Sequence, residues 1–391
     1  MNRALIITIG IVIIILILGV WVYLMLFGTP EKGGDVFTNL GFELSVQDTT
    51  IAPPVDSQPI ETLVDTQSGA ALRQLTTRPI AGFAFISASS STYVRYVERG
   101  TGHMYQINLD TGVENILSRT TVPRVTKAIF SPNANTVALT SYDDYLSNVF
   151  VGTLDDDSNL IGIALQPGAN NISFSSDEDV LYAISNKGDT QGYTHNIHTL
   201  VQSELFSIDY SNLDIAWGSD LEEMYLTTKP SKELEGFIYT TKDNVLTPTI
   251  FSAYGLSALF SNDYIIATHI NGDIYTSIAV DTLESEYELP IIALKEKCVP
   301  DTIITGYLWC AAPFTDTTPS FVEDWYKGTV TSDDSLWHVD ILGQTAQLSA
   351  TPKNLIGRQI DVLSIKINTA GSNLSFINKI DHTLWLYDLV K

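Results

Sequence analysis

The stretch that decides the fold is residues 128–144, AIFSPNANTVALTSYDD, which predicts two β-strands joined by a tight turn. The first strand ends at Phe130, and the second covers Thr136–Ser141. Between them, Pro132 sets the φ angle and Asn133 tolerates left-handed geometry, so this segment has the chemistry of a turn.

The same unit recurs along the chain with a nearly constant period. Further strand–turn–strand segments read FAFISASSSTYVRY, ISFSSDEDVLYAIS, IAWGSDLEEMYLTT and SALFSNDYIIATHI. The aromatic residues that mark the units are 45, 44, 43 and 43 residues apart, at Phe85, Phe130, Phe174, Trp217 and Phe260. A period in the forties, built only from short alternating strands, is typical of a β-propeller with four strands per blade. The sequence therefore predicts an all-β propeller fold.

Two later units, centred on Cys298 and Ile367, bring the predicted number of blades to seven. The third strands repeat as well, and each ends in Asp before a turn: HMYQINLD, NVFVGTLD, GDIYTSIAVD, SLWHVD and TLWLYD. Blade six is longer because Ala311–Thr331 is inserted between its second and third strands. No α-helix outside the membrane is required by this pattern.

The two ends of the repeat region predict how the ring closes. The chain ends in Thr383–Leu389, which resembles a third strand and leaves the fourth strand of its blade missing. Ala71–Arg78 is an isolated strand that precedes the first blade. We expect the last blade to combine Asp361–Leu389 with Ala71–Arg78, because this pairing hides an otherwise exposed sheet edge.

An apolar segment near the amino terminus predicts a membrane anchor. Ala4–Phe27 contains 24 residues without a charge, a length of about 36 Å in a helix, which is enough to span a bilayer. Arg3 precedes the segment, while Glu31 and Asp35 follow it, so the positive-inside rule places the N-terminus in the cytoplasm. The domains are then 1–27, a cytoplasmic stub and signal anchor in the lipid bilayer; 28–70, a flexible tether; and 71–391, an extracytoplasmic propeller at the cell membrane.

The charge balance limits the kinds of partner. The chain carries 45 acidic and 21 basic residues, for a net charge of −24. An excess of this size disfavours nucleic acid and anionic lipid surfaces. It is compatible with cationic partners, divalent metal, or a solvated acidic surface.

Several short motifs suggest chemistry that their context does not support. Asp110-Thr111-Gly112 matches an aspartic protease motif but has no second copy, so a turn aspartate fits better. His195 and His198 would point to opposite faces of a strand, which disfavours a metal site. Asp155-Asp156-Asp157 lacks the spacing of a calcium loop and leaves only adventitious calcium binding. We predict no cofactor and no resident metal.

The chain resembles the TolB-type (PD40) propellers, relatives of WD40 domains, in its Ser131-Pro132 turn and the degenerate copies at Ser175-Ser176 and Gly218-Ser219. The resemblance covers about residues 71–391. The whole chain also resembles bacterial single-pass proteins that carry a propeller outside the membrane. Both resemblances imply an architecture and no particular activity.

Cys298 and Cys310 are the two cysteines of the chain, and they fall on adjacent predicted strands of blade six. Their midpoint lies in the turn between these strands, so the two side chains could face each other. We predict a disulfide, with two buried free thiols as the alternative.

These features favour a membrane-anchored platform that binds or assembles protein partners, and no catalytic residue is assigned. The alternatives are a propeller hydrolase or lyase, and a module that binds glycan or cell-wall polymer. The partner is expected on the face that carries the connections between second and third strands, where loop lengths vary most. The candidate binding residues on these connections are Tyr142, Asp143, Asp144, Tyr145, Lys187, Asp189, Tyr193, Asp316, Glu323, Asp324, Trp325 and Tyr326. Trp325 and Tyr326 are either interface anchors or core residues that cover a groove between blades.

Overall fold

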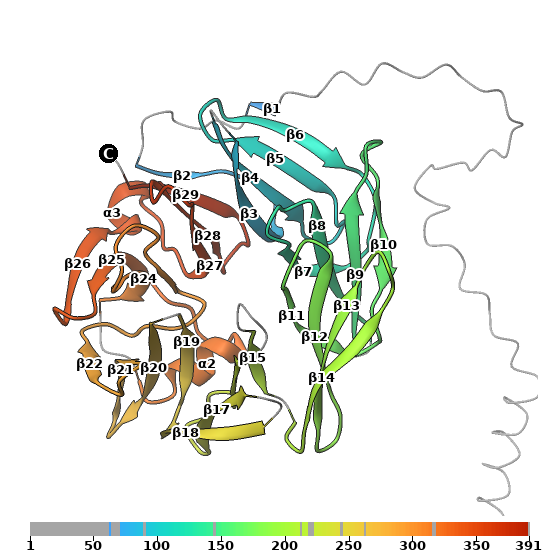
Figure 1. The fold of residues 1–391 in the computed structure, drawn as a ribbon. Helices are drawn as coiled ribbons and strands as arrows, with labels where there is room; N and C mark the ends of the chain where they lie inside the picture. Colours follow the sequence, from blue (N-terminus) through green and yellow to red (C-terminus); the bar gives the residue numbers. More distant parts are fainter. Residues whose placement is uncertain are drawn as a thin grey trace, which may run out of the picture. The chain divides into compact units, whose positions relative to one another are not determined.

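The computed structural model of the chain describes residues 62–63, 71–88, 91–143, 146–211, 213–217, 223–242, 245–261, 263–314 and 318–389. These residues form seven antiparallel sheets, the blades of a propeller (Figure 1). The predicted membrane span and most of the predicted tether lie outside the described residues. Within the described ranges, no helix combines the length and the apolar character needed to cross a membrane.

Blades 2 to 6 are four-stranded meanders, blade 1 has four consecutive strands and one added strand, and the blades are numbered here in chain order. The strands of blades 1 to 3 are β3 (Ile80–Ala88), β4 (Ser91–Glu98), β5 (Met104–Asn108), β6 (Val113–Ser118), β7 (Val125–Phe130), β8 (Thr136–Asp143), β9 (Leu146–Leu154), β10 (Leu160–Ala164), β11 (Ala169–Phe174), β12 (Asp179–Ser185), β13 (Thr190–Asn196) and β14 (Gln202–Ile208). The strands of blades 4 to 6 are β15 (Asp214–Ala216), β16 (Glu223–Thr227), β17 (Glu235–Lys242), β18 (Val245–Tyr254), β19 (Ser257–Phe260), β20 (Tyr264–Asn271), β21 (Ile274–Asp281), β22 (Glu286–Leu289), β23 (Cys298–Pro300), β24 (Tyr307–Pro313), β25 (Asp334–Asp340) and β26 (Thr345–Ala350). The predicted seven-bladed all-β propeller is confirmed.

Blade 7 closes the ring with strands from both ends of the described chain. It consists of β27 (Val362–Ile367), β28 (Asn373–Asn378), β29 (Leu384–Asp388) and β2 (Leu72–Gln74). The register pairs Leu72 with Tyr387 and Gln74 with Trp385 in an antiparallel ladder. The predicted closure is therefore confirmed. A further short strand, β1 (Thr62–Leu63), pairs with β6 at the outer edge of blade 1.

Apolar cores between neighbouring blades hold the ring together. Each of seven buried clusters joins side chains of two adjacent blades, from the pair 1 and 2 around to the pair 7 and 1. Inner strands are buried on both faces, as in β12, whereas outer strands such as β14 are mostly exposed. Because apolar burial is the main stabilising term, the first and second strands carry most of the fold's stability.

The turn that opened the sequence analysis has the predicted position but a different left-handed residue. Ala134 has φ 57°, rather than Asn133. The Asn133 side chain instead accepts a hydrogen bond from the Asn135 amide at 2.7 Å, which closes an Asx turn. The Asn133 amide donates to the Asp177 carboxylate of the next blade at 2.8 Å, so successive turns contact each other.

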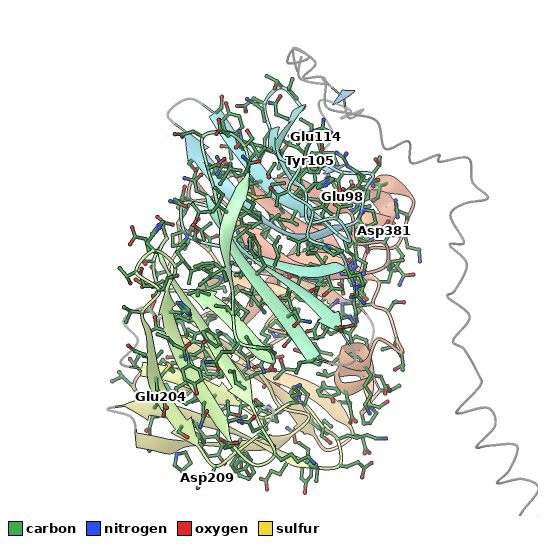
Figure 2. The ribbon with its side chains drawn as sticks, turned by 90° about the vertical axis from the view of Figure 1, so that its right-hand side faces the viewer. Glu98, Tyr105, Glu114, Glu204, Asp209 and Asp381 are labelled. Carbon is green, nitrogen blue, oxygen red and sulfur yellow. A yellow bond between two sulfur atoms is a disulfide. The ribbon has the colours of Figure 1, made fainter. Side chains whose placement is uncertain are left out.

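Arg78 fixes the closing segment to blade 1. Its guanidinium donates to the Glu114 carboxylate and lies 4.1 Å from the centre of the Tyr105 ring. Figure 2 shows Glu98, Tyr105 and Glu114 close together on the strands of blade 1. The Tyr96 hydroxyl donates to the same Glu114 side chain. These contacts add polar anchoring to the apolar core between blades 7 and 1.

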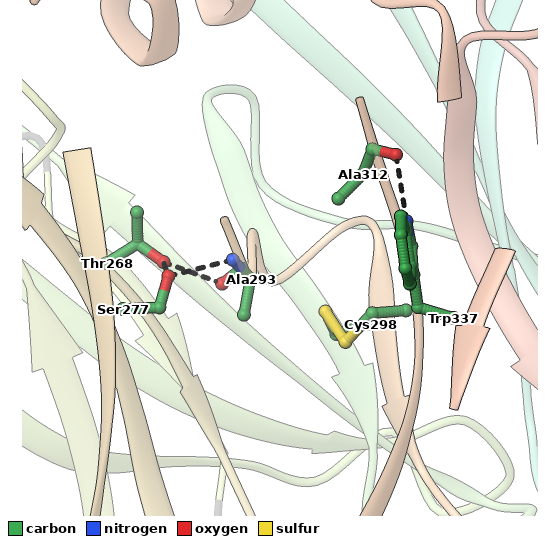
Figure 3. The surroundings of a disulfide bond; sticks show 7 residues. Thr268, Ser277, Ala293, Cys298, Ala312 and Trp337 are labelled. Carbon is green, nitrogen blue, oxygen red and sulfur yellow. Dashed lines mark hydrogen bonds between the residues drawn. A yellow bond between two sulfur atoms is a disulfide. The ribbon is translucent and has the colours of Figure 1, made fainter. Parts of the chain in front are cut away.

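Cys298 and Cys310 face each other across β23 and β24 and are joined by a disulfide. Their Cα atoms are 4.1 Å apart, and both side chains are buried in the core between blades 5 and 6. Figure 3 shows the bond near Trp337, whose indole N–H donates to the Ala312 carbonyl at 3.2 Å. The bridge ties the first two strands of blade 6 together.

Among the residues that the structure describes, two short helices add to the predicted all-β pattern. Helix α2 (Phe321–Lys327) lies in the long connection of blade 6, and α3 (Pro352–Ile356) follows β26. In Figure 1, α2 is the orange helix beside β15 and β19, inside the ring of blades. Alternating strand patterns do not reveal such a helix, because it is short and lies within an insertion.

Candidate functional site

The candidate site is a cavity of about 830 Å³ at the centre of the propeller, which we call the channel pocket. Its walls are the first strands β7, β11, β15, β19 and β27, together with one face of α2 and the segment before β23. The polar residues that line it are Lys127, Asn171, Asp214, Lys229, Lys295, Glu296, Glu323, Tyr326, Lys327, Ser364 and Lys366. Lys229 and α2 belong to connections between second and third strands. The pocket therefore lies toward the face on which the sequence predicts a partner.

Two lysines enter the pocket without an acidic partner. Lys366 donates a hydrogen bond to the Phe83 carbonyl at 2.8 Å and lies 5.2 Å from the centre of that phenyl ring. Burial among the surrounding blades lowers the pKa of Lys366 to about 8. Desolvation also lowers the pKa of Lys127; nearby Lys295 adds to this effect, whereas Glu296 and Asp214 oppose it. In the described part of the chain, no ion pair or hydrogen bond engages the Lys127 ammonium group.

The acidic side chains of the pocket are already engaged with other groups. Asp214 forms an ion pair with Lys295 at 2.8 Å. Glu296 accepts a hydrogen bond from the Tyr326 hydroxyl at 2.5 Å, and its other oxygen lies 3.9 Å from Lys295. Burial raises the pKa of Glu296, partly opposed by Lys295 and Tyr326. The acids thus stabilise Lys295 and α2. Glu296 and Asp214 also attract Lys127 from a distance, but neither Lys127 nor Lys366 has an ion pair among the described residues.

Backbone irregularities direct these lysines into the pocket. The pairing of β7 with β8 shifts register between Val125 and Lys127, and that of β27 with β28 shifts between Leu363 and Lys366. Ser364, inside the second shift, has φ 54°. A β-bulge rotates the following side chain relative to the regular alternation. Each lysine therefore follows a bulge in an innermost strand.

A buried charge cluster holds α2 in place through Trp325. The indole is 2% exposed, and its N–H donates to both carboxylate oxygens of Asp361 at 2.9 and 3.1 Å. Lys379 lies 3.8 Å above the ring centre and Lys297 lies 4.8 Å from it. Lys297 also forms an ion pair with Asp361 at 2.7 Å and with Asp334. Cation–π contacts and charged hydrogen bonds of this kind are strong when shielded from water.

The structure brings only some of the predicted binding residues together. Glu323 and Tyr326 line the channel pocket, whereas Trp325 points away from it into the core. The Trp325 side chain is therefore not available as an interface anchor, and the alternative interpretation of a core residue applies to it. Asp324 contributes to the end of α2, where its carbonyl accepts from the Thr329 amide at 3.0 Å.

The remaining predicted residues lie away from the pocket. Tyr142 and Asp143 are exposed at the end of β8, and Asp143 is within 3.4 Å of Arg124. Asp189 is half-buried before β13, and the Tyr193 ring stacks on Tyr182 at 5.4 Å. Lys187 is exposed in the same connection. The other predicted residues, Asp144, Tyr145 and Asp316, lie outside the described residues.

The sequence did carry one signal for the residues that were missed. Lys127 and Lys366 each interrupt an apolar first strand, in VTKAIF and LSIKI. A charged side chain in the innermost strand of a blade can reach solvent only in the central channel, so such a residue is a candidate for a site in that channel.

The fold is shared with proteins of different activities. Neither the family models nor the curated proteins that were compared give a match. Among solved structures, an oligogalacturonate lyase in complex with manganese aligns with a TM-score of 0.57 and 10% identity, over 85% of this chain and 96% of that one. The Cps50 (Swd1) propeller domain of Myceliophteria thermophila aligns with a TM-score of 0.52 and 9% identity, over 82% of this chain and 100% of that one. TolB from Acinetobacter baumannii aligns with a TM-score of 0.42 and 13% identity, over 76% of this chain and 64% of that one. The chain is a seven-bladed β-propeller similar in fold to this lyase and to the Cps50 (Swd1) domain, and these identities carry the fold alone.

Proposed function

We propose that this protein is a binding module that receives its ligand in the channel pocket. The observation that carries the proposal is the pair of lysines, Lys127 and Lys366, which enter an open cavity without an acidic partner. Both side chains are exposed to this cavity, and desolvation by the surrounding strands still lowers the pKa of each lysine. Perturbed lysines in a cavity are typical of functional sites. The anchor predicted at 4–27 would display this module outside the membrane, where it would serve as a platform for its ligand.

Binding is favoured over catalysis by the condition of the acidic groups. Most hydrolases and lyases with a carboxylic acid or carboxylate in the catalytic role need that group free within reach of the substrate. Here Asp214 is paired with Lys295, and Glu296 is bonded to Tyr326. The fold itself does not decide, because an oligogalacturonate lyase and the Cps50 domain both align over most of this chain.

A photoreactive side chain at the pocket mouth tests the proposal. We would replace Lys229 by p-benzoylphenylalanine and use Leu283, which is 83% exposed in a connection between third and fourth strands, as the matched control. Connections of these two kinds lie on opposite faces of a propeller, because successive strands run antiparallel. After irradiation in intact cells, the whole protein is weighed by mass spectrometry. We expect a defined adduct from position 229 and none from position 283, and equal or reversed labelling would reject the proposal.

One observation favours an enzyme as the second candidate. The raised pKa of Glu296 is a property of general acids. A Glu296→Gln variant would separate the two functions, because it keeps the shape of the pocket while removing the proton donor. If the variant binds the ligand but no longer converts it, the protein is an enzyme. If neither the parent protein nor the variant converts the ligand, the protein is a binding module.

A further inference from the structure

The charge of the channel pocket is opposite to that of the whole chain. The chain has 21 basic and 45 acidic residues, but the pocket is lined by five lysines and three acids. The difference, five minus three, leaves two positive charges. Two of the acids, Asp214 and Glu323, form ion pairs with the pocket lysines Lys295 and Lys327.

Three of the five pocket lysines, Lys127, Lys229 and Lys366, form no ion pair among the described residues, and the side chains of Lys127 and Lys366 are exposed to the channel. Lys127 and Lys366 come from the first strands of blades 2 and 7, which flank blade 1. Neither ammonium has a carboxylate within ion-pair distance among the described residues. Because both side chains are exposed to the channel, a ligand that enters the pocket can reach their ammonium groups. The two ammonium groups are therefore positioned for a negative charge that enters from outside.

The size of the cavity limits what can carry that charge. A volume of about 830 Å³ matches the range of sites for small molecules, about 300–1,000 Å³. Long polyanions would meet the repulsion of an exterior with a net charge of −24. A small anion can cross this exterior and reach donors that are preorganised in the ring.

We infer that the channel pocket binds a small organic anion bearing two or more acidic groups, held between Lys127 and Lys366. This inference rests on the proposed function and adds the chemical class of its ligand. Lysine binds carboxylate and phosphate alike as a point charge, so both groups fit the site. Lys295 lies near Lys127, and its own charge is balanced by Asp214 and Glu296.

Isothermal titration calorimetry of the full chain tests the inference at low ionic strength. Citrate and pyrophosphate are the probes, and glycerol is the neutral comparison. The variants are Lys127→Met and Lys366→Met, which keep the aliphatic stem, with the corresponding Gln variants as a second set if either fails to fold. The matched control is Lys353→Met on α3, where an exposed lysine pairs with Asp333 at 3.1 Å outside the pocket.

We expect at least one of the two anions to bind, and each pocket variant to weaken it about tenfold or more, while the Lys353 variant binds like the parent. The anion that binds more tightly identifies the acidic group. No binding of either anion at about 10 mM, or equal binding by all variants, would overturn the inference. An adduct at position 229 without anion binding would leave the proposed function standing and remove only the ligand class. Anion binding in calorimetry without such an adduct in cells would support the ligand class and count against the proposed function.

Discussion

Replacing Trp325 should expose how firmly α2 is attached to the propeller. The side chain is 2% exposed and packs with Tyr275, Leu294 and Val322. Truncating a buried aromatic residue to alanine typically costs about 3–5 kcal/mol. The same change takes one donor from Asp361 and the aromatic surface from two lysines, so we expect a loss near the upper end of that range.

A Trp325→Phe variant separates packing from hydrogen bonding. Phenylalanine keeps a ring beneath Lys297 and Lys379 but has no N–H for Asp361. A hydrogen bond to a charged group contributes about 1.5–3 kcal/mol, so this variant should lose about that amount. Leu283→Ala, at an exposed position, should stay within about 0.5 kcal/mol of the parent protein.

Urea unfolding followed by circular dichroism measures these differences from the shift in midpoint at a common slope. The expected order of stability is parent and Leu283→Ala first, then Trp325→Phe, then Trp325→Ala. A Trp325→Ala protein within about 1 kcal/mol of the parent would refute the view that Trp325 anchors the helix.

Three further results are expected. Removing the bridge by a Cys298→Ser/Cys310→Ser double substitution should cost about 3 kcal/mol in urea unfolding for a loop of 12 residues, and alkylatable thiols in the unreduced, unfolded parent protein would contradict the bond. A chain that starts at residue 81 should melt well below one that starts at residue 66, because only the shorter chain loses β2; equal melting temperatures would refute the closure. Lys366→Met should be more stable than the ligand-free parent near neutral pH. The pKa of Lys366 is about 8 in the folded protein and 10.5 ordinarily, so between these pH values the unfolded parent protein binds more protons than the folded one. The parent protein therefore becomes more stable as the pH rises through this window, and the advantage of the variant should shrink. A stability difference in urea unfolding that stays constant from about pH 7 to 10.5 would contradict this.

The ring could be read from the sequence because its inner strands are buried on both faces. β8 and β12 each contain a continuous run of buried residues, and each follows a turn and a first strand at a fixed interval. The closing strand was readable for a different reason, since a blade that ends in a third strand needs a fourth from elsewhere. Outer strands such as β26 are mostly exposed and leave little pattern.

The candidate site could not be read in the same way. Lys127 and Lys366 are visible as charges in apolar strands, but their direction depends on the bulges before them. A bulge shifts the alternation of side chains between the two faces of a strand by one residue, and the sequence around Ser364 has no pattern that predicts it. The position of α2 likewise depends on Trp325 meeting Asp361 and Lys379, residues from another blade. Contacts between distant parts of the chain decided both features.

Trp325 and Tyr326 show how the helix separates anchoring from binding. Consecutive residues of a helix point about 100° apart, so Trp325 enters the buried charge cluster while Tyr326 faces the channel pocket and donates to Glu296. The wall of the pocket is therefore in place before a ligand arrives, and binding has little chain to order. Substitution of Trp325 would weaken binding by loosening this wall, an effect that depends little on salt. Substitution of Lys127 or Lys366 would remove a charge that attracts the ligand, and with it part of the salt dependence of the affinity. The slope of affinity against ionic strength therefore distinguishes residues that hold the pocket from residues that bind in it.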